Sequence, residues 1–315
     1  YFIGKPGSVS LLVRKGDPVL GGTNILSLGF VTQLNDPGQF LYDLRYDTAG
    51  GAAPASDADD RALWIYTPGA GHFQVLREGA PAPGTVGATF SKPGNSWFVN
   101  VGASNFNSSG VALLTADLDG GDTVVGVNDQ ALYLVDLFGE TMVSRKGDSA
   151  PGTDADFSFF HSSNTRLNNN GDVAFQAGLV GGTSTTDDDV GIWAVIGGTM
   201  QLVVREGDPV PGYPNHVFGS TNGQSMYFND QGQVMFNNTP RDATTLFNVD
   251  RGLWVWDPLC GLRTVLRVND TVEVTPGVFK DVSGFGGIQF NNGNCASLHF
   301  AHDGTTTLDV SMTDG

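Results

Sequence analysis

The chain has 315 residues, and its 33 acidic residues outnumber 16 basic ones to give a formal net charge of −17. Nucleic-acid binding needs clustered Lys and Arg to neutralise phosphates, so this composition excludes it and disfavours anionic membrane surfaces for the same reason. The sequence contains no run of about 18 apolar residues, so no membrane-spanning segment is predicted. Its 40% hydrophobic residues suffice to bury a core.

Two phrases recur five times along the chain. The first, written "VREGDPVPG" in its clearest copy, places an arginine at Arg14, Arg77, Arg145, Arg205 and Arg267. The second, of the form Asn-x-x-Gly, starts at Asn35, Asn107, Asn168, Asn229 and Asn291. A shared period near 60 residues indicates an array of one supersecondary unit. We place the repeats at approximately 1–60, 61–128, 129–188, 189–249 and 250–315.

Four strands are predicted in each repeat. The first strand follows an aspartate and contains "LWIYTP", "LYLVD", "IWAVI" or "LWVWDP", starting near Asp60, Asp129, Asp189 and Asp250. β-Branched and aromatic residues in such short runs are typical of strands. A short turn leads to the second strand, which ends at the recurring arginine, before Gly-Asp-Pro. A longer loop then leads to the third strand.

The Asn-x-x-Gly phrase predicts the hairpin turn between the third and fourth strands. Gly38, Gly110, Gly171 and Gly232 stand where the turn needs a positive φ, and the fifth repeat has Asn294 there. The residue four positions on is predicted to face the core; these residues are Tyr42, Leu114, Phe175, Phe236 and Leu298.

The pattern predicts an all-β fold: one domain over 1–315, built as a five-bladed β-propeller of four-stranded antiparallel blades. The alternative is an open β-repeat array, either a solenoid or a row of small sheets. Residues 1–16 align with a first and second strand, and "TTTLDVSM" stands where another first strand is due. We therefore expect the two termini to meet in one blade.

The tandem phrases resemble the NxxGxxAF tandem-repeat proteins of bacterial surfaces, which carry varied C-terminal anchors. Arg205 to Gly212 and Asn168 to Phe175 carry the resemblance most clearly, whereas Ala80 and Asn269 depart from the first phrase. The resemblance implies a propeller-like, secreted or cell-surface bacterial protein and no particular reaction. Because the chain starts at Tyr1 without a signal peptide, we expect a mature or trimmed chain.

Blade topology predicts where ligands bind. The tight turns should lie at one end of each blade, and the long, variable loops at the other, where binding usually occurs. Those loops are rich in Asp and contain rings that could stack on a sugar or sit in the core. The candidate ligand-binding residues are Phe160, His161, Tyr213 and His216.

The segment "DLDGGD" is the best candidate for a metal site. Alternate carboxylates around a glycine turn can converge on calcium, which prefers oxygen ligands. The metal candidates are Asp117, Asp119 and Asp122. Turn formation and solubility are the alternative explanation for these aspartates.

The recurring arginine is interpreted as structural, because five copies suit an Arg–Asp pair that pins every blade alike. Expected partners are the aspartate three residues on and the one that starts the first strand.

No nucleophile elbow, His-Glu-x-x-His or Walker motif occurs. The sequence thus favours a non-catalytic extracellular binding or structural module with a glycan, calcium or a surface protein as ligand. A glycoside hydrolase or polysaccharide lyase using loop carboxylates, and a self-assembling surface component, remain alternatives. The oligomeric state stays open, as does the choice between a Cys260–Cys295 disulfide and two free thiols.

Overall fold

The computed structural model describes residues 1–5, 7–19, 23–51, 55–56, 58–91, 99–101, 105–221, 225–285 and 310–312. Every regular element in these ranges is a β-strand. The described residues include no helix long and apolar enough for a membrane crossing. Two compact units, residues 1–146 and 147–315, are considered separately.

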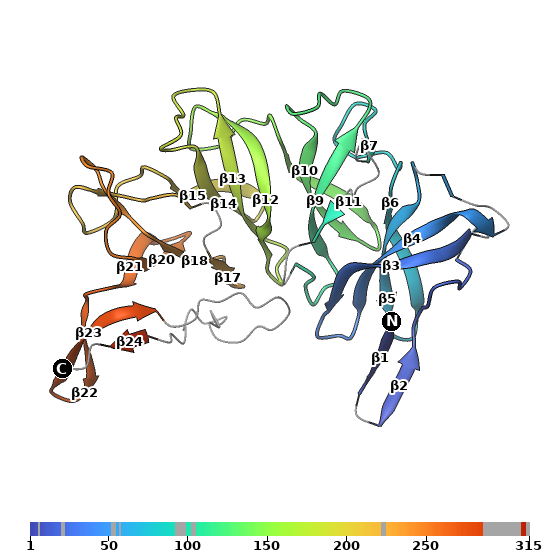
Figure 1. The fold of residues 1–315 in the computed structure, drawn as a ribbon, viewed down its shortest axis with the longest axis horizontal. Helices are drawn as coiled ribbons and strands as arrows, with labels where there is room; N and C mark the ends of the chain where they lie inside the picture. The colour runs from blue at the N-terminus through green and yellow to red at the C-terminus, as the bar shows by residue number, and fades with distance from the viewer. Residues whose placement is uncertain are drawn as a thin grey trace. The chain divides into compact units, whose positions relative to one another are not determined.

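The first unit contains two sheets and a hairpin (Figure 1). Blade A is the sheet β3 (Thr23–Leu34), β4 (Phe40–Gly51), β5 (Arg61–Thr67) and β6 (Gly71–Arg77), in that order. Blade B comprises β7 (Thr89–Phe90), β8 (Val99–Asn100), β9 (Ala112–Asp119), β10 (Gln130–Asp136) and β11 (Gly139–Arg145), with β7 and β8 both paired to β9. The hairpin is β1 (Phe2–Lys5) and β2 (Ser8–Leu11).

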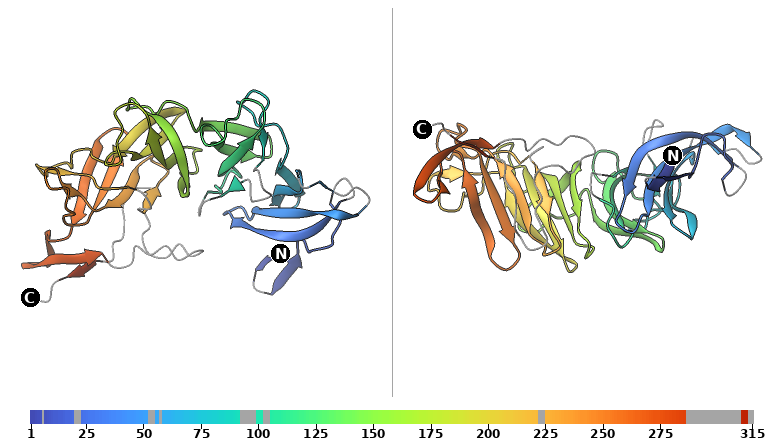
Figure 2. Two further views of the ribbon diagram at one scale, coloured as in Figure 1. Left: turned by 45° about the horizontal axis from the view of Figure 1, so that its top comes forward. Right: turned by 90° about the horizontal axis from the view of Figure 1, so that it is seen from below.

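The second unit contains two four-stranded sheets whose strands run side by side (Figure 2). Blade C is β12 (Asp156–Leu167), β13 (Val173–Val180), β14 (Val190–Ile196) and β15 (Thr199–Arg205). Blade D is β17 (Met226–Phe228), β18 (Val234–Asn238), β20 (Gly252–Asp257) and β21 (Gly261–Arg267), with the ribbon β16 (His216–Val217) and β19 (Arg241–Asp242). A last sheet holds β22 (Thr271–Thr275), β23 (Val278–Phe285) and β24 (Val310–Met312).

Each four-stranded blade joins the third and fourth strands of one repeat to the first and second strands of the next. In blade C, β12 and β13 are followed by β14 and β15, all antiparallel. The composition explains this order: β13 and β14 are buried along most of their length and need cover on both faces. The more polar β15 is only partly buried and lies at the edge.

The blade cores repeat one packing of rings. Phe157 at the start of β12 meets Trp193 of β14 edge-on at 5.0 Å, and Phe175 of β13 stacks on the same Trp at 6.2 Å. Phe218 and Phe236 surround Trp254 in the same way in blade D. The predicted core residues Tyr42, Leu114, Phe175 and Phe236 are all buried. That prediction is confirmed for these four.

The turn after the recurring arginine is identical in all five copies. A backbone N–H in the turn donates to the carbonyl of a residue in or before the next third strand, and that residue's N–H donates back, with N–O distances of 2.8–3.0 Å. The five receiving residues are Ile25, Phe90, Phe157, Phe218 and Val282, all buried. Asn269 adopts φ 70° in the fifth copy, where the other four have glycine. The phrase therefore ties the end of a second strand to the core residue of the following third strand.

The turn asparagine has two structural roles. Its Oδ1 accepts backbone N–H groups of its own turn, as Asn168 does from Asn170 and Asp172. Its Nδ2 donates to the main-chain carbonyl of the equivalent asparagine one repeat on. Asn35 reaches Asn107 at 2.8 Å in the first unit, and Asn168 reaches Asn229 at 3.1 Å in the second. These groups are buried, so the asparagine couples neighbouring blades.

The predicted turn geometry is confirmed. Gly38, Gly110, Gly171 and Gly232 have φ between 76° and 86°. Their turns contact the first-to-second-strand turns of the same blade, through bonds such as Gly197 N–H to Asp172 Oδ1 at 2.9 Å. The long loops contact each other instead, as Thr183 and Asp154 show. Tight turns and long loops therefore lie at opposite ends of a blade, as predicted.

The all-β class and the four-stranded antiparallel blade are confirmed. Three expectations stay predictions: closure of five blades into a ring, one domain over 1–315, and a blade shared by the termini. The predicted C-terminal strand is present as β24, which pairs with β23. Asn291, Asn294, Leu298 and Cys295 lie outside the described residues. Cys260 is exposed, and the choice between a disulfide and free thiols stays open.

Replacing Asn168 by Asp keeps the acceptor that caps its turn but removes the donor to Asn229. We expect the free energy of unfolding to fall by about 1–3 kcal/mol, because the buried Asn229 carbonyl keeps only the Gly232 N–H and the new carboxylate faces Asp172. Urea denaturation of the full chain measures this change. Gln231→Glu, an amide-to-carboxylate change at an exposed turn position, is the control. Equal stability of the two variants would show that the bond between repeats contributes nothing.

Candidate functional site

The long loops form what we call the loop end of each blade. Its described segments are 55–56, 58–60, 78–88 and 120–129 in the first unit, and 147–155, 181–189, 207–217 and 239–251 in the second. In blade B the two loops touch: Asp122 N–H donates to the Val86 carbonyl at 3.0 Å. A side chain at Gly121 would collide with the backbone at Gly87. The loops of one blade thus make one continuous surface.

The recurring arginine holds the loop end together. Its Nε donates to a main-chain carbonyl just before the first strand: Asp59 for Arg77 at 3.1 Å, Asn128 for Arg145 at 2.7 Å and Asp188 for Arg205 at 2.5 Å. The rest of each guanidinium binds a loop carboxylate; the pairs are Arg77–Asp59, Arg145–Asp122 and Arg205–Asp188. The predicted structural role is confirmed in these three copies.

The carboxylate partners differ from the expected ones. The aspartate three residues on accepts the arginine's own backbone N–H instead, as Asp208 does from Arg205 at 2.7 Å and Asp270 from Arg267 at 2.6 Å. The Arg14 side chain does pair with that aspartate, Asp17. The +3 carboxylate caps the tight turn, which leaves the guanidinium free to reach back to the loop.

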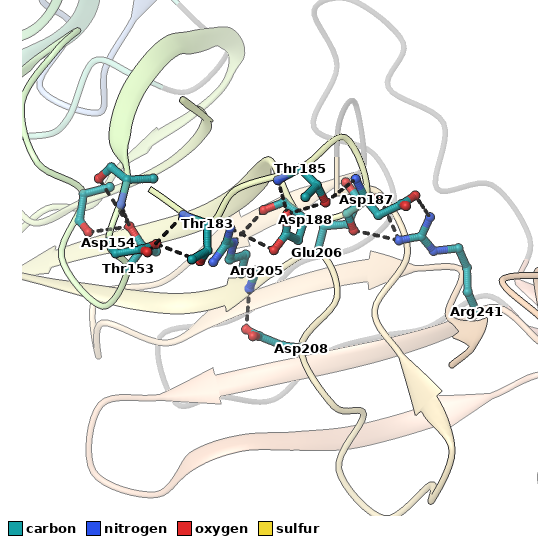
Figure 3. Close-up of polar contacts among 12 residues, drawn as sticks. Thr153, Asp154, Thr183, Thr185, Asp187, Asp188, Arg205, Glu206, Asp208 and Arg241 are labelled. Carbon is teal, nitrogen blue, oxygen red and sulfur yellow. Dashed lines mark hydrogen bonds and ion pairs between the residues drawn. The ribbon is translucent and has the colours of Figure 1, made fainter. Parts of the chain in front are cut away.

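Figure 3 shows the polar network at the loop end of the second unit. Arg205 lies between Asp188 and Asp208, and the Asp188 carboxylate also caps Thr185. Arg241, from the loop of blade D, reaches the blade C residues Asp187, at 3.4 Å, and Glu206, at 3.1 Å. Arg241 therefore joins the loop ends of two neighbouring blades.

In three ion pairs of the loop end the cation lies deeper than its loop aspartate, whereas Asp60 lies deeper than Arg45, and Glu206 lies deeper than Arg241. The exposed fractions of the side chains are 8% for Arg145 against 35% for Asp122, and 14% for Arg205 against 30% for Asp188. Arg241 is 14% exposed, whereas Asp187 is 60% exposed. In these three pairs the aspartate is therefore the more exposed member.

Two buried glutamates follow the recurring arginine. Glu78 and Glu206 are 2% and 4% exposed. Burial raises the pKa of Glu78 to about 7, and the neighbouring Asp60 adds to the shift while Arg61 opposes it. Burial likewise raises the pKa of Glu206 to about 7 and outweighs the opposing effect of Arg241. Neither carboxyl group is placed to touch a substrate.

Blade A also buries a compact group of charges that sequence analysis missed. Asp60 accepts a hydrogen bond from Arg45 Nε at 2.7 Å and lies beside Arg61 at 3.4 Å. On the same blade, Asp43 accepts from Val31 N–H at 2.8 Å, and burial raises its pKa to about 6. Glu78 lies beside Asp60 and Arg61 of this group. A sequence signal pointed to it, because two of the four glutamates in the chain, Glu78 and Glu206, occupy the same repeat position.

The first pair of predicted ligand residues divides between core and surface. Phe160 is buried and packs at a tilt against Phe157 and edge-on against Phe175, so its ring belongs to the blade core. His161 is half-buried where β12 bulges away from β13, and its Nδ1 hydrogen-bonds Ser163 at 3.0 Å. Burial lowers the pKa of His161.

The second pair comes together at the loop end of blade D. The rings of Tyr213 and His216 lie edge-on at 6.4 Å. The Arg267 guanidinium covers one face of Tyr213 at 3.8 Å, and His216 pairs with Asp242 in the small ribbon. A sugar would therefore find at most one open face on Tyr213.

The predicted metal ligands have other partners. Asp122 binds Arg145, whose hydrogen bond holds the pKa of that carboxyl below its usual range. Asp119 Oδ1 accepts the adjacent Gly120 N–H at 2.8 Å, and Asp117 lies on β9 opposite Gln130. Within the described ranges, no three His, Cys, Asp or Glu side chains are gathered as a metal site requires. Calcium binding stays a prediction.

Comparisons with known proteins give a family and a distant structural likeness. A family model described as "Family of unknown function (DUF7453)" matches residues 1–315. No curated protein matches the sequence. A solved structure of Penicillium chrysogenum alpha-L-arabinanase complexed with arabinobiose has 12% identity and a TM-score of 0.32, covering 85% of this chain and 71% of that one. A TM-score this low carries no argument about function.

Replacing Arg145 by Lys tests how the loop end is held. A lysine cannot contact Asp122, Thr123 and the Asn128 carbonyl together, so we expect a loss of about 2 kcal/mol in local stability. Amide hydrogen exchange in 120–129 should become faster, whereas the exposed control Arg263→Lys should leave it unchanged. Unchanged exchange in Arg145→Lys would contradict the proposed role.

The buried glutamate predicts a pH dependence of stability. Burial raises the pKa of Glu78 from its ordinary value of 4.5 to about 7 in the folded chain. The folded chain therefore binds this proton more tightly than the unfolded chain does, and protonation stabilises the fold. The free energy of unfolding should fall between pH 4.5 and about 7, by about 3 kcal/mol for this group. Glu78→Gln should flatten that part of the urea-denaturation profile, and the exposed control Glu273→Gln should not. Identical profiles for wild type and Glu78→Gln would contradict the burial argument.

Proposed function

We propose that this chain, which belongs to the DUF7453 family of unknown function, is a non-catalytic binding module whose loop end receives a cationic partner. The orientation of its ion pairs carries the proposal. Arginines under the loops neutralise their aspartates only from below, so the outward carboxylates, such as Asp187, keep an attractive field for positive charge. The partner we favour is a basic protein surface.

The positions of the titratable groups favour binding over catalysis. A general acid must come within hydrogen-bond reach of its substrate. Glu78 and Glu206 have the pKa values best suited to proton transfer at neutral pH, but both are buried beneath the loops. The neighbouring carboxylates are occupied by arginines or by turn N–H groups, as Asp188 and Asp242 are.

The aromatic residues support a protein partner over a glycan. Stacking on a sugar requires an exposed ring face. Phe160 is buried, and Arg267 covers one face of Tyr213. The resemblance of the repeats to exported bacterial surface proteins supports a location outside the cell, where such a module would meet other proteins.

A short peptide of alternating lysine and serine tests the proposal. At about ten residues it spans roughly 35 Å, so it reports on the loop end of one unit rather than on total charge. Calorimetry should detect binding at low ionic strength that weakens as salt rises to about 0.15 M. The loop-end variants Asp119→Asn, in the first unit, and Asp187→Asn, in the second, should each bind more weakly than wild type.

The matched control removes the same charge from the tight-turn end. Asp136→Asn keeps the net charge equal to that of either loop-end variant, and an asparagine at 136 still accepts the turn N–H of Phe138. This control should bind the peptide as wild type does. Equal losses in the control and the loop-end variants, or an absence of binding by wild type, would refute the proposed function.

A further inference from the structure

The loop end of blade B holds four exposed valines outside its core. Their exposed fractions are 77% for Val86, 56% for Val124, 72% for Val125 and 57% for Val127. Val86 comes from the loop before β7 and the other three from the loop between β9 and β10. The hydrogen bond from Asp122 N–H to the Val86 carbonyl joins the two loops, so the four valines belong to one surface. Scattered single apolar residues need no explanation, but such a group marks an interaction site.

The valines are held outward by a rigid loop. Asn128 Oδ1 accepts the Val124 N–H at 2.6 Å, and Asp129 Oδ2 accepts the Gly126 N–H at 2.6 Å. The Val127 N–H closes a turn on the Val124 carbonyl at 2.9 Å. Arg145 fastens both arms of the loop from below. A partner that docks here orders little of the loop, so the loop-ordering part of the entropy cost of binding is small.

Acidic side chains surround the valines. Asp122 and Asp129 are 35% and 25% exposed, whereas their cations Arg145 and Lys146 are 8% and 16% exposed. A bound partner therefore meets apolar groups beside partly uncovered carboxylates. This arrangement disfavours an acidic partner and complements a segment in which apolar side chains alternate with lysine or arginine.

We propose that the paired loops of blade B are a docking site for a basic protein segment that places apolar side chains against Val86, Val124, Val125 and Val127. The inference rests on the proposed function, because the acidic loop end attracts the segment before the valines bind it. The valines supply selectivity, since a purely polar basic segment buries none of them.

Two peptides separate attraction from docking. One alternates lysine with leucine and the other alternates lysine with serine, at equal length and charge. Wild type should bind the leucine peptide at least about tenfold more tightly than the serine peptide. Val86→Ser, Val125→Ser should abolish this preference and retain binding of the serine peptide. The control Leu137→Ser, Phe138→Ser changes exposed apolar residues in the tight turn of the same blade and should keep the preference.

The possible outcomes distinguish the two proposals. Equal binding of both peptides by wild type, or a preference that persists without Val86 and Val125, would overturn the docking site and leave the acidic loop end intact. Binding to phosphatidylcholine vesicles that depends on the valines, with no preference between peptides, would assign the patch to lipid and also overturn it. If the serine peptide shows no dependence on Asp119 and Asp187, the proposed function itself fails.

Discussion

The fold depends on one side-chain amide used in two directions. In each unit the turn asparagine accepts N–H groups of its own hairpin with Oδ1 and donates Nδ2 to the asparagine of the next repeat. An aspartate could cap the turn, and a lysine could donate to the carbonyl, but only an amide of this length does both. Because both partners are buried, the turn and the contact between blades form together or leave polar groups unsatisfied. This coupling explains why the asparagine recurs when neighbouring turn residues vary.

A second constraint acts at the other end of the blade. The recurring arginine ends the second strand, and its guanidinium reaches back to the loop that precedes the first strand of the same sheet. The adjoining turn binds a buried residue in or before the next third strand. One short phrase therefore closes its own loop and positions the following sheet. The acidic surface is a by-product of this design, because the cation that organises each loop has to lie beneath it.

Repetition made much of the fold predictable from the sequence. The candidate site was less predictable, because its residues do not recur between repeats. The periods of Arg77 and Asn168 indicated four strands, the positive φ of Gly171 and the separation of turns from loops. They did not indicate that a blade joins two repeats, because that order depends on burial of β13 and β14 on both faces. Phe160 illustrates this difference. The surrounding sequence is compatible with a ring in a loop or in the core, and only the packing against Phe157 and Phe175 shows that the ring is in the core. Arg241 bound to Glu206 was invisible for a similar reason, since neither recurs with a partner at constant spacing.

The position after the recurring arginine differs between the repeats, although the residues around it are repeated. It holds Glu78 next to Asp60 and Arg61 in one copy, Lys146 paired with Asp129 in another and Glu206 paired with Arg241 in a third. The loops vary in the same way, with Val124 and Val125 in blade B, Thr185 and Thr186 in blade C, and exposed Leu246 and Phe247 in blade D. The arginine and the turn keep each loop ordered whatever its tip contains, so the tips can change chemistry at little cost to the fold. Recognition by this protein is therefore expected to reside in residues that differ between copies, and a partner that reads several tips would bind in one orientation.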